Sequence, residues 1–586
     1  MRFSALFRPY WRQLMLGLLA LITTNLFALI LPRLVNMGIS VIEGKKVPYF
    51  TSITSIVLAI LALAVLAAIA RTYSRILMFG VGREIERDVR RDVFVHLSTL
   101  SPSFYEKRSV GDLMSHMTSD INNIRMCTGF AVLNILNIVI VFAGTAPVLF
   151  SIDHQVAFAA LLPFPLVMIT AQALSGRMFQ RVREYQASLS DLSARIQENL
   201  SGAQVVRVFH QEEAENTRFA AVNDHAFRAA IRLAKMRVVM FPLMRMMGAL
   251  GVAVTLFVGG RAVVLGHIDL GDYVEINARL LQLAWPAISL GFVMSVYSRG
   301  QASLARMNVL LEARPEIVGG ALPAPKQVVR DSADQFFVVA HNLSVQLPQS
   351  AKPILYGVSF TVKPGEVLGV VGPTGAGKST LTRALCREVN VARGQLLIDG
   401  QDICDWQLHA LRKFVAVAPS EAFLFSASMR SNITFARPDA SQDEVMEVVR
   451  MVDLTRDVDG FADGLETMIG ERGVTLSGGQ RQRVALARAI LARPKMLILD
   501  DCLSAVDAQT QSTIVERLKQ PVGDGTHTPP AMIIVSHRLS VVQEANEIVV
   551  LDKGQIVERG THLELLTKGA LYRALWGLQL LEEELG

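Results

Sequence analysis

The sequence is poor in charged residues for its length. Only 19% of its 586 residues are charged, whereas 51% are hydrophobic. A soluble protein needs more surface charge than this, so a fully soluble enzyme is excluded. The apolar content also excludes a disordered chain, and the length exceeds that of a single domain. We therefore expect a membrane protein with a soluble part.

Cysteine is also scarce. The four cysteines show neither C-x-x-C pairing nor metal-ligand spacing: Cys127, Cys386, Cys404 and Cys502. This distribution favours reduced packing residues over a disulfide framework or a thiolate metal site. The net charge of +6 on so apolar a chain suits anionic lipid head groups at least as well as nucleic acid. We expect membrane lipids, and no nucleic acid, among the partners.

Six apolar runs are long enough to cross a bilayer core, which takes about 20 helical residues. They are residues 14–35, 53–70, 128–150, 156–174, 240–265 and 273–297. The first run follows basic residues, as a signal peptide does, but it is too long, lacks a small-residue cleavage site and is followed by further spans. We expect a six-helix membrane domain over residues 1–312.

Basic residues near the span ends predict the orientation. They concentrate after the second span and between the fourth and fifth, so both connections and both termini are expected on the cytoplasmic side. Lys45 and Lys46 in the short outer loop are an exception that the larger groups outweigh. Both connections have helical periodicity, so we expect helices that continue beyond the bilayer. The residues are Arg83, Arg87, Arg90, Arg91, Lys107 and Arg108, then Arg177, Arg181, Arg183, Arg195 and Arg207.

A few polar residues interrupt the last two spans. Glu275 and Arg279 are four residues apart, so on a helix they share a face and can pair. Charge at membrane depth usually faces a cavity or the protein interior. A neutralised structural pair and a substrate contact are both open for them, as for Arg245. With Trp285, these residues suggest a substrate cavity of mixed polarity.

A Gly/Pro-rich passage at 319–325 ends the helical periodicity, and we interpret residues 313–335 as a linker. From residue 336 onward, short β-branched runs alternate with helical stretches, which is typical of an α/β domain. The sequence therefore predicts a second, soluble domain over residues 336–586.

The chemistry of this second domain begins at an apolar run, 367–371, which predicts a buried strand. It leads into a loop with the spacing G-x-x-x-x-G-K-[ST], whose backbone N–H groups surround phosphates at a helix N-terminus. Lys378 can reach the β- and γ-phosphates, and the Ser379 hydroxyl can ligate Mg²⁺. We expect these residues to bind a nucleotide: Gly372, Pro373, Thr374, Gly375, Ala376, Gly377, Lys378, Ser379 and Thr380.

Two further motifs follow downstream. The apolar run 496–500 ends in Asp500, a carboxylate that can hold Mg²⁺ opposite the phosphate loop. A second glycine-rich helix start precedes it and makes a second phosphate-binding N-terminus. One nucleotide does not need two cradles from one chain, but a dimer does if each chain presents its cradle to the other's nucleotide. The second cradle consists of Leu476, Ser477, Gly478, Gly479 and Gln480.

With these motifs the chain resembles a half-transporter of the ABC exporter superfamily, of the type IV fold, over nearly its whole length. The resemblance implies six membrane helices fused to a P-loop ATPase domain, the cofactors ATP and Mg²⁺, a second half-transporter as partner, and ATP-driven export of amphiphilic small molecules. Residues 476–480 match the family signature without change. Asp507, in 504–507, resembles the D-loop, and His537 resembles the switch histidine that senses the γ-phosphate. Residues 104–125, and 198–202 with Phe209, resemble the cytoplasmic connections that dock on nucleotide domains.

Three positions depart from the family, and all touch the same nucleotide. Asp501 stands where the family has its catalytic glutamate and is one methylene shorter. Part of the general-base assistance, worth about 10²–10⁴ in rate, should be missing. Ser420 replaces the glutamine that reaches Mg²⁺ and couples to the membrane helices. Leu347 stands where an aromatic residue stacks on adenine, and base stacking on an aromatic is worth about 1–3 kcal/mol.

The resemblance then favours the degenerate-site subunit of a heterodimeric multidrug-type exporter. Its own phosphate loop would hold ATP with slow or no turnover, while its signature completes the hydrolytic site of the partner. A homodimer with two slow sites, a regulatory subunit that binds ATP without hydrolysing it, and an importer of siderophores with the exporter fold are the alternatives. The half-transporter layout, without a targeting segment, fits a bacterial inner membrane best.

Overall fold

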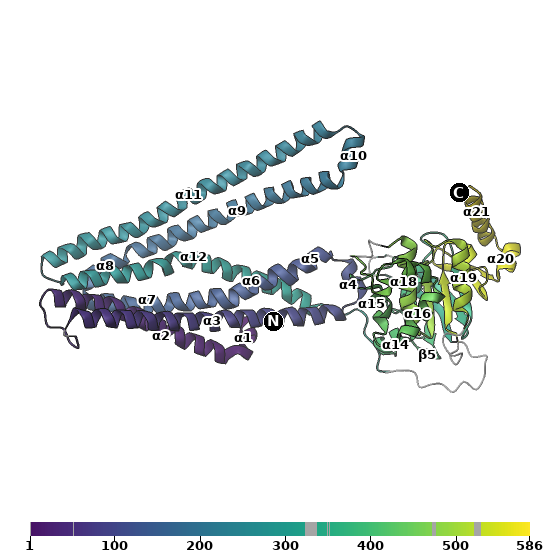
Figure 1. Cartoon of the computed structure of the whole chain (residues 1–586), viewed down its shortest axis with the longest axis horizontal. Helices are drawn as coiled ribbons and strands as arrows, with labels where there is room; N and C mark the ends of the chain where they lie inside the picture. Colours follow the sequence, from purple (N-terminus) through teal and green to yellow (C-terminus); the bar gives the residue numbers. More distant parts are fainter. Residues whose placement is uncertain are drawn as a thin grey trace. The chain divides into compact units, whose positions relative to one another are not determined.

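The computed structural model describes residues 2–50, 52–322, 337–347, 350, 352–470, 476–520 and 529–585. The chain divides into two compact units (Figure 1). Met1–Thr99 and Arg108–Arg314 form a helical unit, and Leu100–Lys107 with Pro315–Gly586 form an α/β unit. A membrane helical domain fused to an α/β domain is the fold class expected from the sequence.

The helical unit is built almost wholly from long helices. Its chain is helical from Val110 to Ile152 without a break, with π-helical turns at His116–Asp120 and Met126–Ala131. The α-helices are α1 (Phe3–Phe7), α2 (Trp11–Ile42), α3 (Ile53–Thr99), α5 (Val110–Ser115), α6 (Ile121–Arg125), α7 (Val132–Ile152), α8 (His154–Leu161), α9 (Pro163–Ser201), α10 (Ala203–Val208), α11 (Glu212–Val264) and α12 (Leu270–Glu312).

Within the described residues, four helical segments are long and apolar enough to cross a membrane: Phe3–Ile42, Ile53–Thr99, Val110–Ile152 and Leu270–Glu312. They contain the first, second, third and sixth apolar runs. The fourth run is divided between α8 and α9, and the fifth lies on α11, where Gly251–Val264 is a shorter apolar segment. Several side chains of these two runs, including that of Arg245, lie outside the described residues, so six spans stay a prediction.

The longest helices exceed the thickness of a bilayer, as the helical periodicity of the connections predicts. Helix α11 has 53 residues, which is about 80 Å of helix. Helices α9 and α11 pack side by side, and α10 joins them (Figure 1). An ion pair between Arg195 on α9 and Glu215 on α11, at 2.7 Å, links them near that end.

The α/β unit contains two sheets. The first has the order β2-β1-β4-β5 and is antiparallel, and the second has the order β10-β9-β3-β8-β7-β6, parallel except for the edge strand β10. The strands are β1 (Val338–Val345), β2 (Leu355–Val362), β3 (Val367–Val371), β4 (Leu396–Ile398), β5 (Gln401–Asp402), β6 (Val415–Ala418), β7 (Met496–Asp500), β8 (Ala531–Val535), β9 (Glu547–Asp552) and β10 (Gln555–Gly560).

Helices cover the parallel sheet, whose central strands β3 and β8 are buried at every residue. A strand that is buried on both faces has a continuous run of apolar residues in its sequence, and residues 367–371 form such a run. The α-helices assigned to the α/β unit are α4 (Pro102–Glu106), α13 (Lys378–Leu385), α14 (Leu408–Phe414), α15 (Met429–Ile433), α16 (Gln442–Met451), α17 (Thr455–Gly460), α18 (Gly478–Leu491), α19 (Ala508–Leu518), α20 (His562–Lys568) and α21 (Leu571–Leu585).

The segment expected as a linker is fixed over its described part. Gly320 donates its backbone N–H to the Trp406 carbonyl at 2.7 Å, and Leu322 donates to the Asp405 carbonyl at 3.0 Å. A Cβ on Gly320 would lie 2.1 Å from the Asp405 carbonyl oxygen, so only glycine permits this approach. Residues 315–322 therefore belong to the α/β unit, while 323–336 lie outside the described residues.

Candidate functional site

The glycine-rich loop joins β3 to α13 at the carboxyl end of the parallel sheet. Gly372, Gly375 and Gly377 have φ of +149°, +81° and +104°, values that favour glycine. A Cβ on Gly372 would lie 2.0 Å from the Leu551 carbonyl oxygen, and one on Gly377 would lie 2.8 Å from Leu355 Cδ2. Helix α13 starts directly after Gly377, so its first N–H groups face this loop. The loop fits a chain of phosphates.

Lys378 folds back over this loop. Its Nζ donates to the carbonyl oxygens of Gly372 and Pro373 at 2.7 and 3.0 Å. Burial lowers the pKa of the Lys378 ammonium, while the charges of Asp501 and Asp500 act in the opposite direction. A half-buried cation held at the mouth of a helix N-terminus adds to the attraction for an anion. Ser379 is exposed beside it at the start of α13.

Asp500 ends β7, two strands away from the phosphate loop. Burial raises the pKa of its carboxyl, a hydrogen bond with Thr382 lowers it, and Asp501 raises it further, against the charge of Lys378. The strand order β3-β8-β7 brings the loop and this carboxylate to one edge of the sheet, the place where ligands bind in open α/β folds. The role of Asp500 as an Mg²⁺ ligand stays a prediction.

Asp501 and His537 are joined to each other. The carboxylate of Asp501 lies 2.8 Å from Nδ1 of His537, and Ser536 Oγ lies 3.4 Å from the same carboxylate. Asp501 has φ of +51°, and its backbone N–H donates to the Val535 carbonyl at 2.8 Å. The pairing follows from strand register, because Asp500 is opposite Val535 on β8.

The signature residues form the start of α18. Ser477 caps the helix by accepting from the Gln480 N–H at 3.2 Å, and Gln480 Oε1 accepts from the Ser477 N–H at 2.8 Å. Leu476 is buried and Ser477 is exposed. A Cβ on Gly479 would lie 2.7 Å from the Ala505 carbonyl oxygen, so glycine lets the D-loop approach the helix.

Gln482 is a functional candidate that the sequence reasoning did not single out. It is buried and donates through Nε2 to the Ser420 carbonyl at 3.2 Å and to Ser504 Oγ at 3.0 Å, while its Oε1 accepts from the Ala505 N–H at 2.9 Å. It therefore fixes the signature helix to the Ser420 loop and to the D-loop. The sequence could have indicated this role, because Gln482 is a polar residue on the same helix face as the apolar residues Ala485, Leu486 and Ala489.

The remaining predicted nucleotide residues are placed as follows. Leu347 is half-buried and packs against the core beneath the antiparallel sheet. Ser420 is exposed, and its backbone carbonyl accepts the hydrogen bond from Gln482. Asp507 caps α19 by accepting from the Thr510 N–H at 2.9 Å, and this hydrogen bond lowers the pKa of its carboxyl. The D-loop thus ends in the N-cap of α19.

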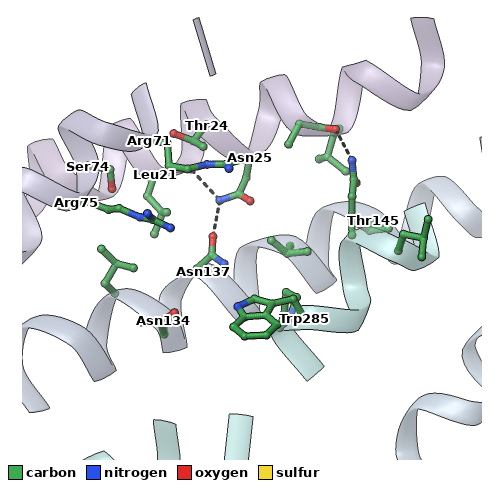
Figure 2. A pocket seen from close by; sticks show the side chains of 17 residues that line it. Leu21, Thr24, Asn25, Arg71, Ser74, Arg75, Asn134, Asn137, Thr145 and Trp285 are labelled. Carbon is green, nitrogen blue, oxygen red and sulfur yellow. Dashed lines mark hydrogen bonds between the residues drawn. The ribbon is translucent and has the colours of Figure 1, made fainter. Parts of the chain in front are cut away.

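The four candidate substrate residues separate in the structure. Glu275 accepts from Arg279 Nε at 3.0 Å and from Asn36 Nδ2 at 2.8 Å, and both members of the ion pair are almost fully buried. This geometry is that of the neutralised structural pair. Trp285 is 74% exposed and lines a cavity of about 360 Å³ (Figure 2). The side chain of Arg245 lies outside the described residues.

Comparison with known proteins decides the family. A model of the ABC transporter transmembrane region matches residues 14–287, and a model of the ABC transporter matches residues 355–504. The chain is 31% identical to the probable multidrug resistance ABC transporter ATP-binding/permease protein YheI of Bacillus subtilis, over 98% of this chain and 96% of the relative. The chain belongs to the ABC transporters. It is also 31% identical to the multidrug resistance-like ATP-binding protein MdlA of Escherichia coli, over 99% and 96% of the two chains.

A solved structure shares the fold of the transporter over its whole length. It is a bacterial Atm1-family ABC exporter with ATP bound, with a TM-score of 0.78, 25% identity and coverage of 97% of this chain and 99% of the other. The transporter thus consists of a membrane helical domain and an ATP-binding ABC domain, and it is an ATPase that couples hydrolysis to transport. Exporters of this architecture work as dimers.

Proposed function

We propose that this chain is one half of an ATP-driven exporter of amphiphilic small molecules (drugs, lipids or peptides) in the cytoplasmic membrane of a bacterium. We propose further that its own nucleotide site is degenerate. In this arrangement two ATP molecules close the nucleotide domains, and hydrolysis at the partner's site resets them. The multidrug relatives and the exporter fold support export.

The observation that carries the degenerate site is the Asp501–His537 pair. A general base must reach the attacking water, and a switch histidine must reach the γ-phosphate. The carboxylate of Asp501, one methylene shorter than glutamate, is instead 2.8 Å from His537. The proposal rests on the shorter reach of Asp501, whose carboxylate lies beside His537 at the end of β7 and so is expected to be a poor base for the attacking water.

ATP binding does not depend on that pair. The loop around Gly372 and Gly377, with Lys378, supplies the phosphate cradle, and Ser379 and Asp500 are the residues that would hold Mg²⁺. When bound, Mg²⁺ neutralises charge on the phosphates. Retained ATP with slow turnover is the expected state of this site.

The signature helix serves the other nucleotide in this proposal. Ser477 is exposed at the N-terminus of α18, and its capping box fixes the first turn in the helical geometry that phosphate binding needs. This chain then contributes its intact cradle to a hydrolytic site built on the phosphate loop of a second half-transporter.

The test is a set of substitutions in the transporter purified from its host membrane together with its second half. Asp501→Ala should change ATP turnover less than about threefold, whereas Ser477→Arg should lower it more than about 100-fold because it obstructs the cradle of the competent site. Ser512→Arg, on the exposed face of α19, is the matched control. A loss of more than tenfold from Asp501→Ala would overturn the degenerate site.

A further inference from the structure

The cavity in the helical unit has a lining of mixed polarity, contributed by helices that contain predicted membrane spans. Residues of α2, α3, α7 and α12 line it, and all four helices belong to one chain and one unit (Figure 2). Its volume of about 360 Å³ falls within the size range of small-molecule sites. A chamber of this kind in a transporter is a place for cargo.

Two arginines give the cavity its charge. Arg71 and Arg75 are one turn apart on α3, both are exposed, and both line the cavity. Among the residues that the structure describes, neither pairs with a carboxylate, and none of the residues that line the cavity is acidic. Ionisable residues in or beside membrane spans normally find a counter-charge or face a cavity. Glu275 and Arg279 form an ion pair, whereas Arg71 and Arg75, which directly follow the second apolar run, line the cavity without a carboxylate among its lining residues.

Most of the uncharged polar side chains of the cavity already donate to carbonyl oxygens, as Thr24, Ser74, Asn134 and Gln282 do. Besides the two guanidinium groups, the side chains that keep a donor for a ligand include Asn137 and Thr145. Asn25 donates to the Asn137 amide oxygen at 3.1 Å, so Asn137 presents its NH₂ group to the cavity. Figure 2 shows this pair beside the two arginine side chains. The Thr145 hydroxyl is fully buried at the cavity wall and has no hydrogen-bond partner among the described residues. Guanidinium, amide NH₂ and hydroxyl groups together match an anion.

The opposite wall suits an apolar chain. Trp285 exposes 74% of its surface on α12, and leucine and valine side chains of α2, α7 and α12 also line the cavity. A ligand that uses both walls has a charged head and an apolar body. A cationic head would meet two uncompensated positive charges and no acceptor carboxylate.

We propose that this cavity binds amphiphiles whose head group is a phosphate or a carboxylate. The head group lies between Arg71 and Arg75, and the apolar part extends along Trp285. Because Arg presents a planar fork of donors, each guanidinium can hold two oxygens of such a head group. This inference rests on the proposed export function and names the charge class of its cargo.

The test measures binding through Trp285. The full-length transporter in phosphatidylcholine nanodiscs carries Trp11→Phe, so Trp285 is the tryptophan of the helical unit that remains. Dodecyl phosphate with a brominated chain should quench it saturably, and the trimethylammonium compound with the same chain should bind at least tenfold more weakly. Arg71→Gln and Arg75→Gln should each weaken binding of the phosphate at least tenfold, while Arg71→Lys retains part of it.

Arg91→Gln is the matched control, because Arg91 lies on the same helix, is exposed and pairs with Asp92 at 3.0 Å. Equal binding of the anionic and cationic compounds, or of wild type and both glutamine variants, would overturn the proposal. Competition by inorganic phosphate against dodecyl phosphate tells whether the cavity selects an amphiphile or a free phosphate ion. Competition only at millimolar concentration supports an amphiphile, whereas competition as tight as that of dodecyl phosphate would overturn it.

Binding and export fail separately in this design, since quenching requires neither ATP nor transport. Saturable quenching without ATP-dependent movement of dodecyl phosphate in proteoliposomes would overturn the export function and leave the binding site intact. Transport of other amphiphiles by a chain that shows no arginine-dependent quenching would overturn the site and leave export intact.

Discussion

Gln482 joins three segments of the nucleotide domain, and its replacement by leucine has a measurable local consequence. Ala505 is exposed, and its N–H donates to Gln482 Oε1 at 2.9 Å. A hydrogen bond of this kind contributes about 0.5–1.5 kcal/mol. Since about 1.4 kcal/mol corresponds to a factor of ten, the amide of Ala505 should exchange about twofold to tenfold faster in Gln482→Leu.

Hydrogen–deuterium exchange of peptides that cover 502–507 measures this directly in the full-length transporter. The exchange of β3 and β8 should not change, which separates local opening from global unfolding. Gln509→Leu, an exposed glutamine of α19, is the control. Unchanged exchange at Ala505 in Gln482→Leu would refute the view that this side chain holds the D-loop to the signature helix.

Two further substitutions test the packing that the structure shows. Gly372→Ala places a Cβ 2.0 Å from the Leu551 carbonyl oxygen, so we expect at least a tenfold loss of affinity for a fluorescent ATP analogue. The control is Gly394→Ala, which is also at positive φ but has open space for a Cβ and should leave binding unchanged. Equal effects of the two substitutions would contradict the role of Gly372 in the phosphate cradle. Glu275→Gln leaves Arg279 buried without a counter-charge, a cost of about 3–5 kcal/mol, so the thermal midpoint in nanodiscs should fall clearly, and the Glu275→Gln/Arg279→Met pair should recover most of it. No recovery in the double variant would show that the pair does more than neutralise itself.

The fold class and the phosphate loop could be predicted from the sequence because both are local signals. Apolar runs indicate spans, and a strand followed by G-x-x-x-x-G-K-S has one structural meaning. Gly372 and Gly377 then lie at positive φ, as a loop that wraps phosphates requires. Asp500 was expected opposite this loop because an apolar run ends in its carboxylate, and the strand order β3-β8-β7 places the loop and Asp500 at one edge of the sheet.

Two features could not be predicted because they arise from segments far apart in the chain. Asp501 and His537 meet only because β7 and β8 pair in a register that places Asp500 opposite Val535. Arg71 and Arg75 directly follow the second apolar run, so in the sequence they mark its end. Only the packing of four helices turns them into the lining of a cavity.

The central claim is that this chain cannot hydrolyse ATP efficiently at its own site. The most direct measurement is ATP hydrolysis by this chain purified alone in lipid nanodiscs, with Lys378→Ala as the blank. We expect turnover at the level of the blank, and recovery of turnover when a second half-transporter with an intact catalytic glutamate is added. Turnover well above the blank would show a working homodimer in which Asp501 is an adequate base, and would contradict the account.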